Sequence, residues 1–161
     1  MNSYVRKDAK RSKTMNTKYI LAASLAGGLI STVLVNTPYV NLINLLVCVG
    51  FWIGPIVAVW LYRRLGGTLT LGQAVVTGLL AGAWHGLFGL VLSPLGLAGV
   101  GSLLNEVRPF VPAQDWPDLE TALTGVGGIL FNLAGVAVDV AFGFIGGLIG
   151  GAVFGARRAT A

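Results

Sequence analysis

Two side chains that can hold or move a proton lie inside long apolar segments of this chain. Asp139 is the only acid in the apolar stretch 122–156, and His85 is the only histidine of the protein. A charge at the centre of a bilayer costs roughly 2.5–3.5 kcal/mol on insertion scales, so such residues usually face the protein interior and have partners. Asn132 precedes Asp139 by seven residues and shares its helix face. Asp139, His85 and Asn132 therefore form a candidate intramembrane polar site.

This polar set has two interpretations, and the sequence does not choose between them. In one, Asp139 and His85 relay a proton or a cation. In the other, Asp139 is protonated or bonded to Asn132, His85 or the backbone and locks the register of the helices. A rise of 1.5 Å per residue places Asp139 about 27 Å before Arg157 and His85 about 22 Å after Thr70, so the two can meet. One histidine and one acid do not make a metal-ligand set, and we expect no metal.

Asp139 interrupts a series of glycines at every fourth position. Residues four apart lie on one helix face, and a face without side chains lets another helix backbone come close. Two other segments have the same spacing. The spacing predicts packing faces, used within the chain or against a second copy. The predicted packing residues are Gly135, Gly143, Gly147, Gly151 and Gly155 in the last segment, Gly78, Gly82 and Gly86, and Gly50 and Gly54. The segment Gly146–Arg158 is similar to the glycine-zipper segments of many small membrane proteins, which implies packing and no activity.

The composition belongs to an integral membrane protein. Of 161 residues, 55% are hydrophobic and 11% charged, against roughly 25% charged in a soluble domain. We predict an all-α, four-helix membrane bundle over residues 19–156 with Gly-rich packing faces. At about 52 Å, the segment 122–156 is too long for a ~30 Å hydrocarbon core, so we expect the glycines near 125–128 to bend it. The predicted spans are 19–35, 42–62, 71–92 and 128–153.

The distribution of lysine and arginine predicts the orientation. Ten of the 11 basic residues lie before the first span, after the second or after the fourth, and Arg108 is the exception. Because cytoplasmic loops carry this excess, we expect both termini in the cytoplasm, with a disordered basic lead 1–18, in which Met15 is an alternative start, and a short tail 157–161. The outer loop 93–121 should contain short interfacial helices, one of them capped by Asp115.

No segment has the spacing of a catalytic or phosphate-binding motif, so we expect neither an enzyme nor a cofactor. The basic residues gather at the ends of apolar runs and not on a folded face, which argues against nucleic acid as a partner. The expected partners are the lipid bilayer and either a second copy or a larger membrane complex. The sequence favours a non-enzymatic structural, assembly or accessory subunit, multi-pass in the plasma or inner membrane. The alternative is a small ion- or proton-coupled transporter or channel that uses Asp139 with His85.

Overall fold

The computed structural model describes residues 17–37, 49–93, 104 and 108–155, and the regular elements in these ranges are all helices. The predicted all-α class is therefore confirmed for the part of the chain that is described. The lead before residue 17, the tail after 155 and much of the predicted outer loop lie outside it. The elements are α2 (Thr17–Val35), α4 (Val49–Arg64), α5 (Leu71–Leu92), the short 3-10 helix η2 (Arg108–Phe110), α7 (Trp116–Thr124) and α8 (Val126–Gly155).

Three of these helices are long and apolar enough to cross a membrane. They are α2, α5 and α8, with 19, 22 and 30 residues. At 1.5 Å per residue these lengths correspond to about 28, 33 and 45 Å, against a hydrocarbon core of about 30 Å. Helix α4 has 16 described residues, because positions 42–48 of the second predicted span lie outside the described residues.

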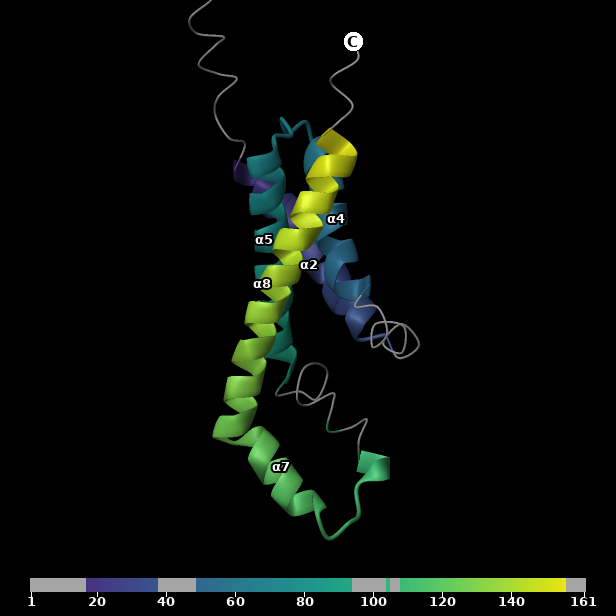
Figure 1. The fold of residues 1–161 in the computed structure, drawn as a ribbon, viewed down its shortest axis with the longest axis vertical. Coiled ribbons are helices and arrows are strands. Elements are labelled where there is room, and N and C mark those ends of the chain that lie inside the picture. Colours follow the sequence, from purple (N-terminus) through teal and green to yellow (C-terminus); the bar gives the residue numbers. More distant parts are fainter. Residues whose placement is uncertain (1–16, 38–48, 94–103, 105–107, 156–161) are drawn as a thin grey trace, which may run out of the picture.

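The four longest helices lie side by side (Figure 1). The largest contact joins α5 to α8, while α2 packs on α4 and α5, and α4 packs on α5 and α8. Helix α7 contacts α8 and extends away from the other helices (Figure 1). The start of α2 and the end of α8 lie at one end of the molecule, together with the turn between α4 and α5 (Figure 1). We call this end the terminal end and the opposite one the far end.

A compact turn sets α4 antiparallel to α5. Gly66 has φ +90°, a backbone conformation that glycine adopts without strain. The side chain of Tyr62 is fully buried beneath the turn. The backbone carbonyl of Tyr62 accepts a hydrogen bond from the backbone N–H of Gly67 at 3.0 Å. Helix α5 then begins with a capping box between Thr70 and Gln73, in which each side chain accepts a bond from the other's backbone N–H.

The last predicted span is longer than expected and begins after a break. The glycine cluster predicts a bend, and the break falls at Gly125, between α7 and α8. A Cβ on Gly128 would collide with the carbonyl of Leu123. A glycine is therefore needed at this position for α8 to begin directly after α7. Helix α8 covers Val126–Gly155 and extends two residues beyond the predicted span 128–153 on each side.

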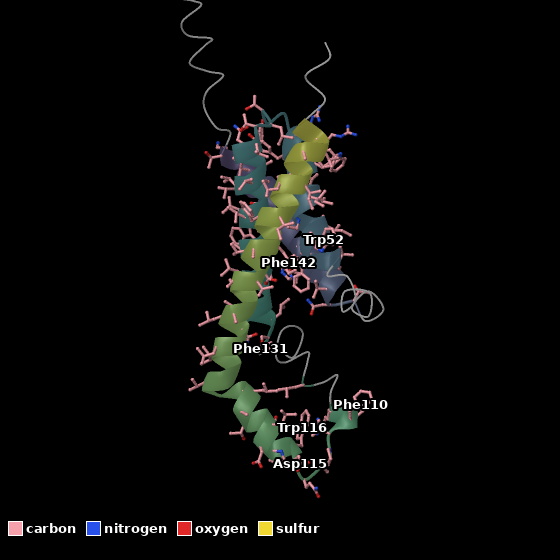
Figure 2. The ribbon with its side chains drawn as sticks, in the orientation of Figure 1. Trp52, Phe110, Asp115, Trp116, Phe131 and Phe142 are labelled. Atoms are coloured by element: carbon pink, nitrogen blue, oxygen red, sulfur yellow. The ribbon has the colours of Figure 1, made fainter. Side chains whose placement is uncertain are left out.

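The far end carries a small polar and aromatic cluster. Figure 2 shows Asp115, Trp116 and Phe110 there, away from the packed helices. The guanidinium of Arg108 lies 5.3 Å from the centre of the Trp116 ring and links η2 to α7. Asp115 occupies the N-cap position, but its side chain makes no capping hydrogen bond. The predicted side-chain cap is therefore wrong, since φ −91° and ψ −10° place Asp115 in the helical region and not in the extended one that capping side chains use.

Helices α5 and α8 touch through their backbones. A Cβ on Gly143 would lie 2.5 Å from the carbonyl oxygen of Gly78, and one on Gly147 would lie 2.8 Å from the carbonyl oxygen of Ala74. Gly82 lies in the same way against the backbone of Asp139. Since Cβ atoms do not come within 3.0 Å of such neighbours, these glycines allow an approach that no other residue would permit.

Small residues also fill the other helix contacts. A Cβ on Gly27 would lie 2.6 Å from that of Ala58 in α4, and one on Gly28 would lie 2.6 Å from that of Trp84 in α5. Gly54 of α4 sits against Ser31, and Gly50 is buried on the same helix. These contacts surround α2 on the sides that face α4 and α5, so its remaining surface is left to the solvent or lipid.

A second row of glycines on α8 faces α4, and the sequence analysis missed it. A Cβ on Gly146 would lie 2.7 Å from the Cβ of Pro55, and one on Gly150 would lie 2.9 Å from the Cβ of Val59. These two glycines lie on the helix face next to the ladder of Gly143 and Gly147. Helix α8 thus presents two glycine rows to two different helices.

The ends of the predicted ladder have no close neighbours. A Cβ on Gly135 or on Gly155 would meet nothing within 4 Å. Gly151 lies against Ala74, and Gly86 of α5 lies against Val136. The structure therefore uses the ladder face from position 139 to position 151, and the predicted packing role of Gly135 and Gly155 has no counterpart among the described contacts.

This difference within one ladder predicts opposite effects of the same substitution. Gly143→Ala should destabilise the protein by about 1–3 kcal/mol, the usual cost of overpacking, because the new methyl meets the Gly78 carbonyl. Gly135→Ala should be neutral or slightly stabilising, because it adds a methyl in open space and removes a helical glycine. Thermal unfolding of both variants in detergent tests this, and equal losses of stability would contradict the packing described above.

Candidate functional site

The structure brings two of the three predicted polar residues into direct contact. Nδ1 of His85 in α5 lies 3.1 Å from Oδ1 of Asp139 in α8. Both residues are buried, with 7% and 8% of their surface exposed. At this distance one proton can lie between the two groups, since a protonated Nδ1 can donate to the carboxylate and a protonated carboxyl can donate to an unprotonated Nδ1. The pair is therefore a place where one proton can be held between two helices.

Glycines next to the pair set its geometry. Gly82, one turn before His85, lies against the backbone at Asp139. Gly86, one residue after His85, lies against Val136, one turn before Asp139. Because α5 and α8 run antiparallel, these two contacts hold the His85 and Asp139 side chains opposite each other. Asp139 lies near the middle of α8, about 20 Å along the helix from Val126.

The pair lines a cavity that lies toward the far end of the helices. The cavity has a volume of about 170 Å³, enough for several water molecules. Its polar lining also includes Asn36 and Asn132, and its other walls are mostly apolar. Asn132, the third predicted residue, shares the cavity with the pair, but in the described part of the chain it makes no hydrogen bond to His85 or Asp139.

Two lining residues were missed by the sequence analysis. Phe51 of α4 packs against His85 with ring centres 5.5 Å apart and an interplanar angle of 85°. Its ring centre is also 5.5 Å from that of Phe142 in α8. Asn36 reaches the cavity from the end of α2, where its Nδ2 donates to the carbonyl of Thr32 at 2.8 Å. No spacing rule could find either, since their positions depend on how α2 and α4 dock.

The surroundings restrict the chemistry of the site. Toward the terminal end, the backbone contact of α5 and α8 closes the space between these two helices. Within the described residues, no group of three or more His, Cys, Asp or Glu could hold a metal ion. The arrangement can therefore hold a proton, a few waters or one small cation beside Asp139, and it can also fix the register of α5 on α8.

Comparison with known proteins assigns the chain to no family. The chain matches no family model, no curated protein and no solved structure. The class of protein follows from the structure alone. Three helices have the length and hydropathy of membrane spans, and large apolar side chains such as Leu29, Val33 and Val91 are exposed. These features indicate a helical membrane protein.

Proposed function

We propose that the chain is a multi-pass protein of the plasma or inner membrane, in which α2, α4, α5 and α8 form a four-span bundle with both termini in the cytoplasm. The terminal end supports this orientation. It carries the start of α2, the end of α8 and the turn that follows α4 (Figure 1). Ten of the 11 basic residues belong to this side by sequence, as the positive-inside rule requires of the cytoplasmic side.

The orientation predicts the behaviour of two fusion proteins. A reporter that is active only in the cytoplasm should be active when fused after Ala161. The same reporter fused after Asp115, at the far end, should be inactive, and one that requires export should show the reverse pattern. An active export reporter after Ala161 would show that the chain crosses the membrane an odd number of times or in the opposite sense.

We infer that the protein is non-enzymatic and acts as a structural, assembly or accessory subunit of a membrane complex. The observation that carries this proposal is the uncovered first half of α8. Most of its large apolar side chains are exposed, and this part extends beyond the end of α5 (Figure 1). They include Ile129, Leu130, Phe131 and Leu133.

The length of α8 adds to this argument. Its 30 residues span about 45 Å, which exceeds the ~30 Å hydrocarbon core. Part of its apolar surface therefore reaches the headgroup region unless the helix tilts strongly. Exposed apolar surface outside hydrocarbon marks a place where another protein binds. The close-packing glycines of α8 are already used on α4 and α5, so a partner that binds α8 would bind its first half.

A photo-reactive amino acid placed at two matched positions tests this surface. Leu133 of α8 and Leu29 of α2 are both 53% exposed, and both lie in apolar helices. In native membranes, the probe at position 133 should crosslink to a discrete partner protein or a second copy, because this surface is covered in the complex. The probe at position 29 should crosslink only to lipid.

If the probes at both positions crosslink only to lipid, no partner protein covers α8. Purification from native membranes in a mild detergent provides the second measurement. The partner crosslinked at position 133 should then copurify with the wild-type chain. A protein that is recovered alone and gives no protein crosslink would not be a subunit of a complex.

The buried His85–Asp139 pair favours a second candidate function, a small ion- or proton-coupled transporter or channel. An ionisable pair in a spanning helix is costly to keep there, and this one lines a cavity that also holds Asn36 and Asn132. A relay would load a proton or cation at Asp139 from the cavity. A structural lock would use the same pair to hold α5 against α8 and would require no exchange with the cavity.

Substitution of the acid separates the relay from the lock. If the pair carries transport, wild-type protein in liposomes should dissipate an imposed ion or pH gradient, and Asp139→Asn should abolish this flux while the protein stays folded. Asp118→Asn provides the control, since it removes an acid from α7, at a distance from the pair. If the wild type shows no flux and Asp139→Asn changes neither flux nor folding, the transporter proposal is wrong.

A further inference from the structure

A second cavity lies at the terminal end, where α4 and α8 both finish. It has a volume of about 540 Å³ and is lined by Trp60, Arg63, Arg64, Val153 and Phe154. This volume falls within the roughly 300–1,000 Å³ range of small-molecule sites. Two of the five lining residues are cationic and none is acidic. The cavity is separate from the one beside Asp139, which lies toward the far end.

Arg63 holds one wall of this cavity in place. Its guanidinium donates a hydrogen bond to the carbonyl of Phe154, one of the last four carbonyls of α8, which have no partner inside the helix. The helix ends are electronegative and would by themselves repel an anion. Arg63 offsets this charge where α4 meets α8. The guanidinium has five N–H donors, so the bond to the Phe154 carbonyl leaves other N–H groups of Arg63 able to bind a ligand.

Arg64 and Trp60 form the second wall. The guanidinium carbon of Arg64 lies 5.3 Å from the centre of the Trp60 ring, within the range of a cation–π contact. Both side chains are exposed, Trp60 to 40%. A tryptophan ring at a helix end belongs at the level of the lipid headgroups. The contact therefore holds the Arg64 guanidinium beside the Trp60 ring at the level of the headgroups. Val153 adds an apolar surface to the same cavity.

We propose that this cavity binds the phosphate of an anionic glycerophospholipid headgroup. Arginine pairs with phosphate through its planar fork of donors, and two arginines face the cavity from the end of one helix. Basic pockets between spanning helices on the cytoplasmic side are the usual sites of anionic lipid headgroups. Trp60 and Val153 supply the apolar side on which the glycerol and the first acyl carbons rest. The site is independent of whether the protein is a subunit or a transporter.

The test uses full-length protein in detergent and compares three ligands. They are phosphatidylglycerol, phosphatidylcholine with the same acyl chains, and inorganic phosphate. Thermal unfolding gives the stabilisation by each, and native mass spectrometry gives the number of lipids that stay bound. The wild type should be stabilised saturably by phosphatidylglycerol and much less by the other two. One phosphatidylglycerol should remain bound per chain.

Two matched variants show where the lipid binds. Arg64→Gln removes an exposed charge that lines the cavity and bears on no other helix contact described above. Lys18→Gln removes an exposed charge from the terminal end of α2, outside the cavity. Arg64→Gln should weaken phosphatidylglycerol binding about fivefold, which corresponds to the ~1 kcal/mol expected for one basic residue near an anionic lipid. Lys18→Gln should leave the affinity unchanged.

Three results would overturn the proposal. Equal weakening by the two variants would mean that general surface charge attracts the lipid. Equal stabilisation by the two lipids would mean that no anion is recognised. Equal stabilisation by inorganic phosphate and phosphatidylglycerol would make a soluble phosphate the ligand. Because Arg63 also supports the end of α8, its variant Arg63→Lys serves as a further check, in which the charge is kept and the planar fork is lost.

Discussion

The backbone contact between α5 and α8 is the constraint on which the rest of the structure depends. Gly78 and Gly82 on one helix meet Gly143, Gly147 and the backbone of Asp139 on the other, with no room for a single methyl group. In lipid there is no hydrophobic force that drives one helix against another, so close van der Waals contact must supply the association. Among the described helices, α5 and α8 share the most extensive contact. It also fixes which side chains face each other at its ends.

The polar pair lies where this contact ends. At Gly82 the two backbones touch, at Gly86 the nearest atoms are the side chain and the Cα of Val136, and at Gly135 no atom of the described residues lies within 4 Å of the Cβ position. The helices therefore separate over about one turn, and the cavity begins in the space between them. His85 and Asp139 lie at this transition, close enough to bond and beside a space large enough for water. A position one turn deeper would place the carboxylate against the backbone of α5.

Helix α8 divides into two halves with different surroundings. Its second half bears two glycine rows and packs on α4 and α5 at once, and its end is held by the bond from Arg63 to the carbonyl of Phe154. Its first half has bulky apolar side chains and little cover from the described residues. The same helix thus provides close backbone packing in one half and an exposed apolar surface in the other. The proposed contacts with a partner and with a lipid headgroup lie at opposite ends of it.

Much of this architecture follows from the sequence, because membrane burial leaves a strong one-dimensional signal. Uncharged runs of about 20 residues predicted α2 and α5 closely, and the glycine cluster near Gly125 predicted the break before α8. The fourth-residue spacing identified the α8 face on which Asp139 lies. The helix rise also showed that Asp139 and His85 can lie at a similar depth in the membrane. It could not show whether the two side chains meet or are offset by one helical turn.

Tertiary structure alone decided which of these residues meet. Periodicity ranks Gly135 and Gly143 as equals, yet one is in open space and the other touches a backbone, because only docking shows where the helices diverge. The row of Gly146 and Gly150, the ring of Phe51 beside His85 and the cavity around Arg63 depend on how α4 docks, and no spacing in the chain encodes this. The sequence by itself determined which helices form and which faces are small or polar, since these are local properties. Which faces meet is a property of the packed helices together.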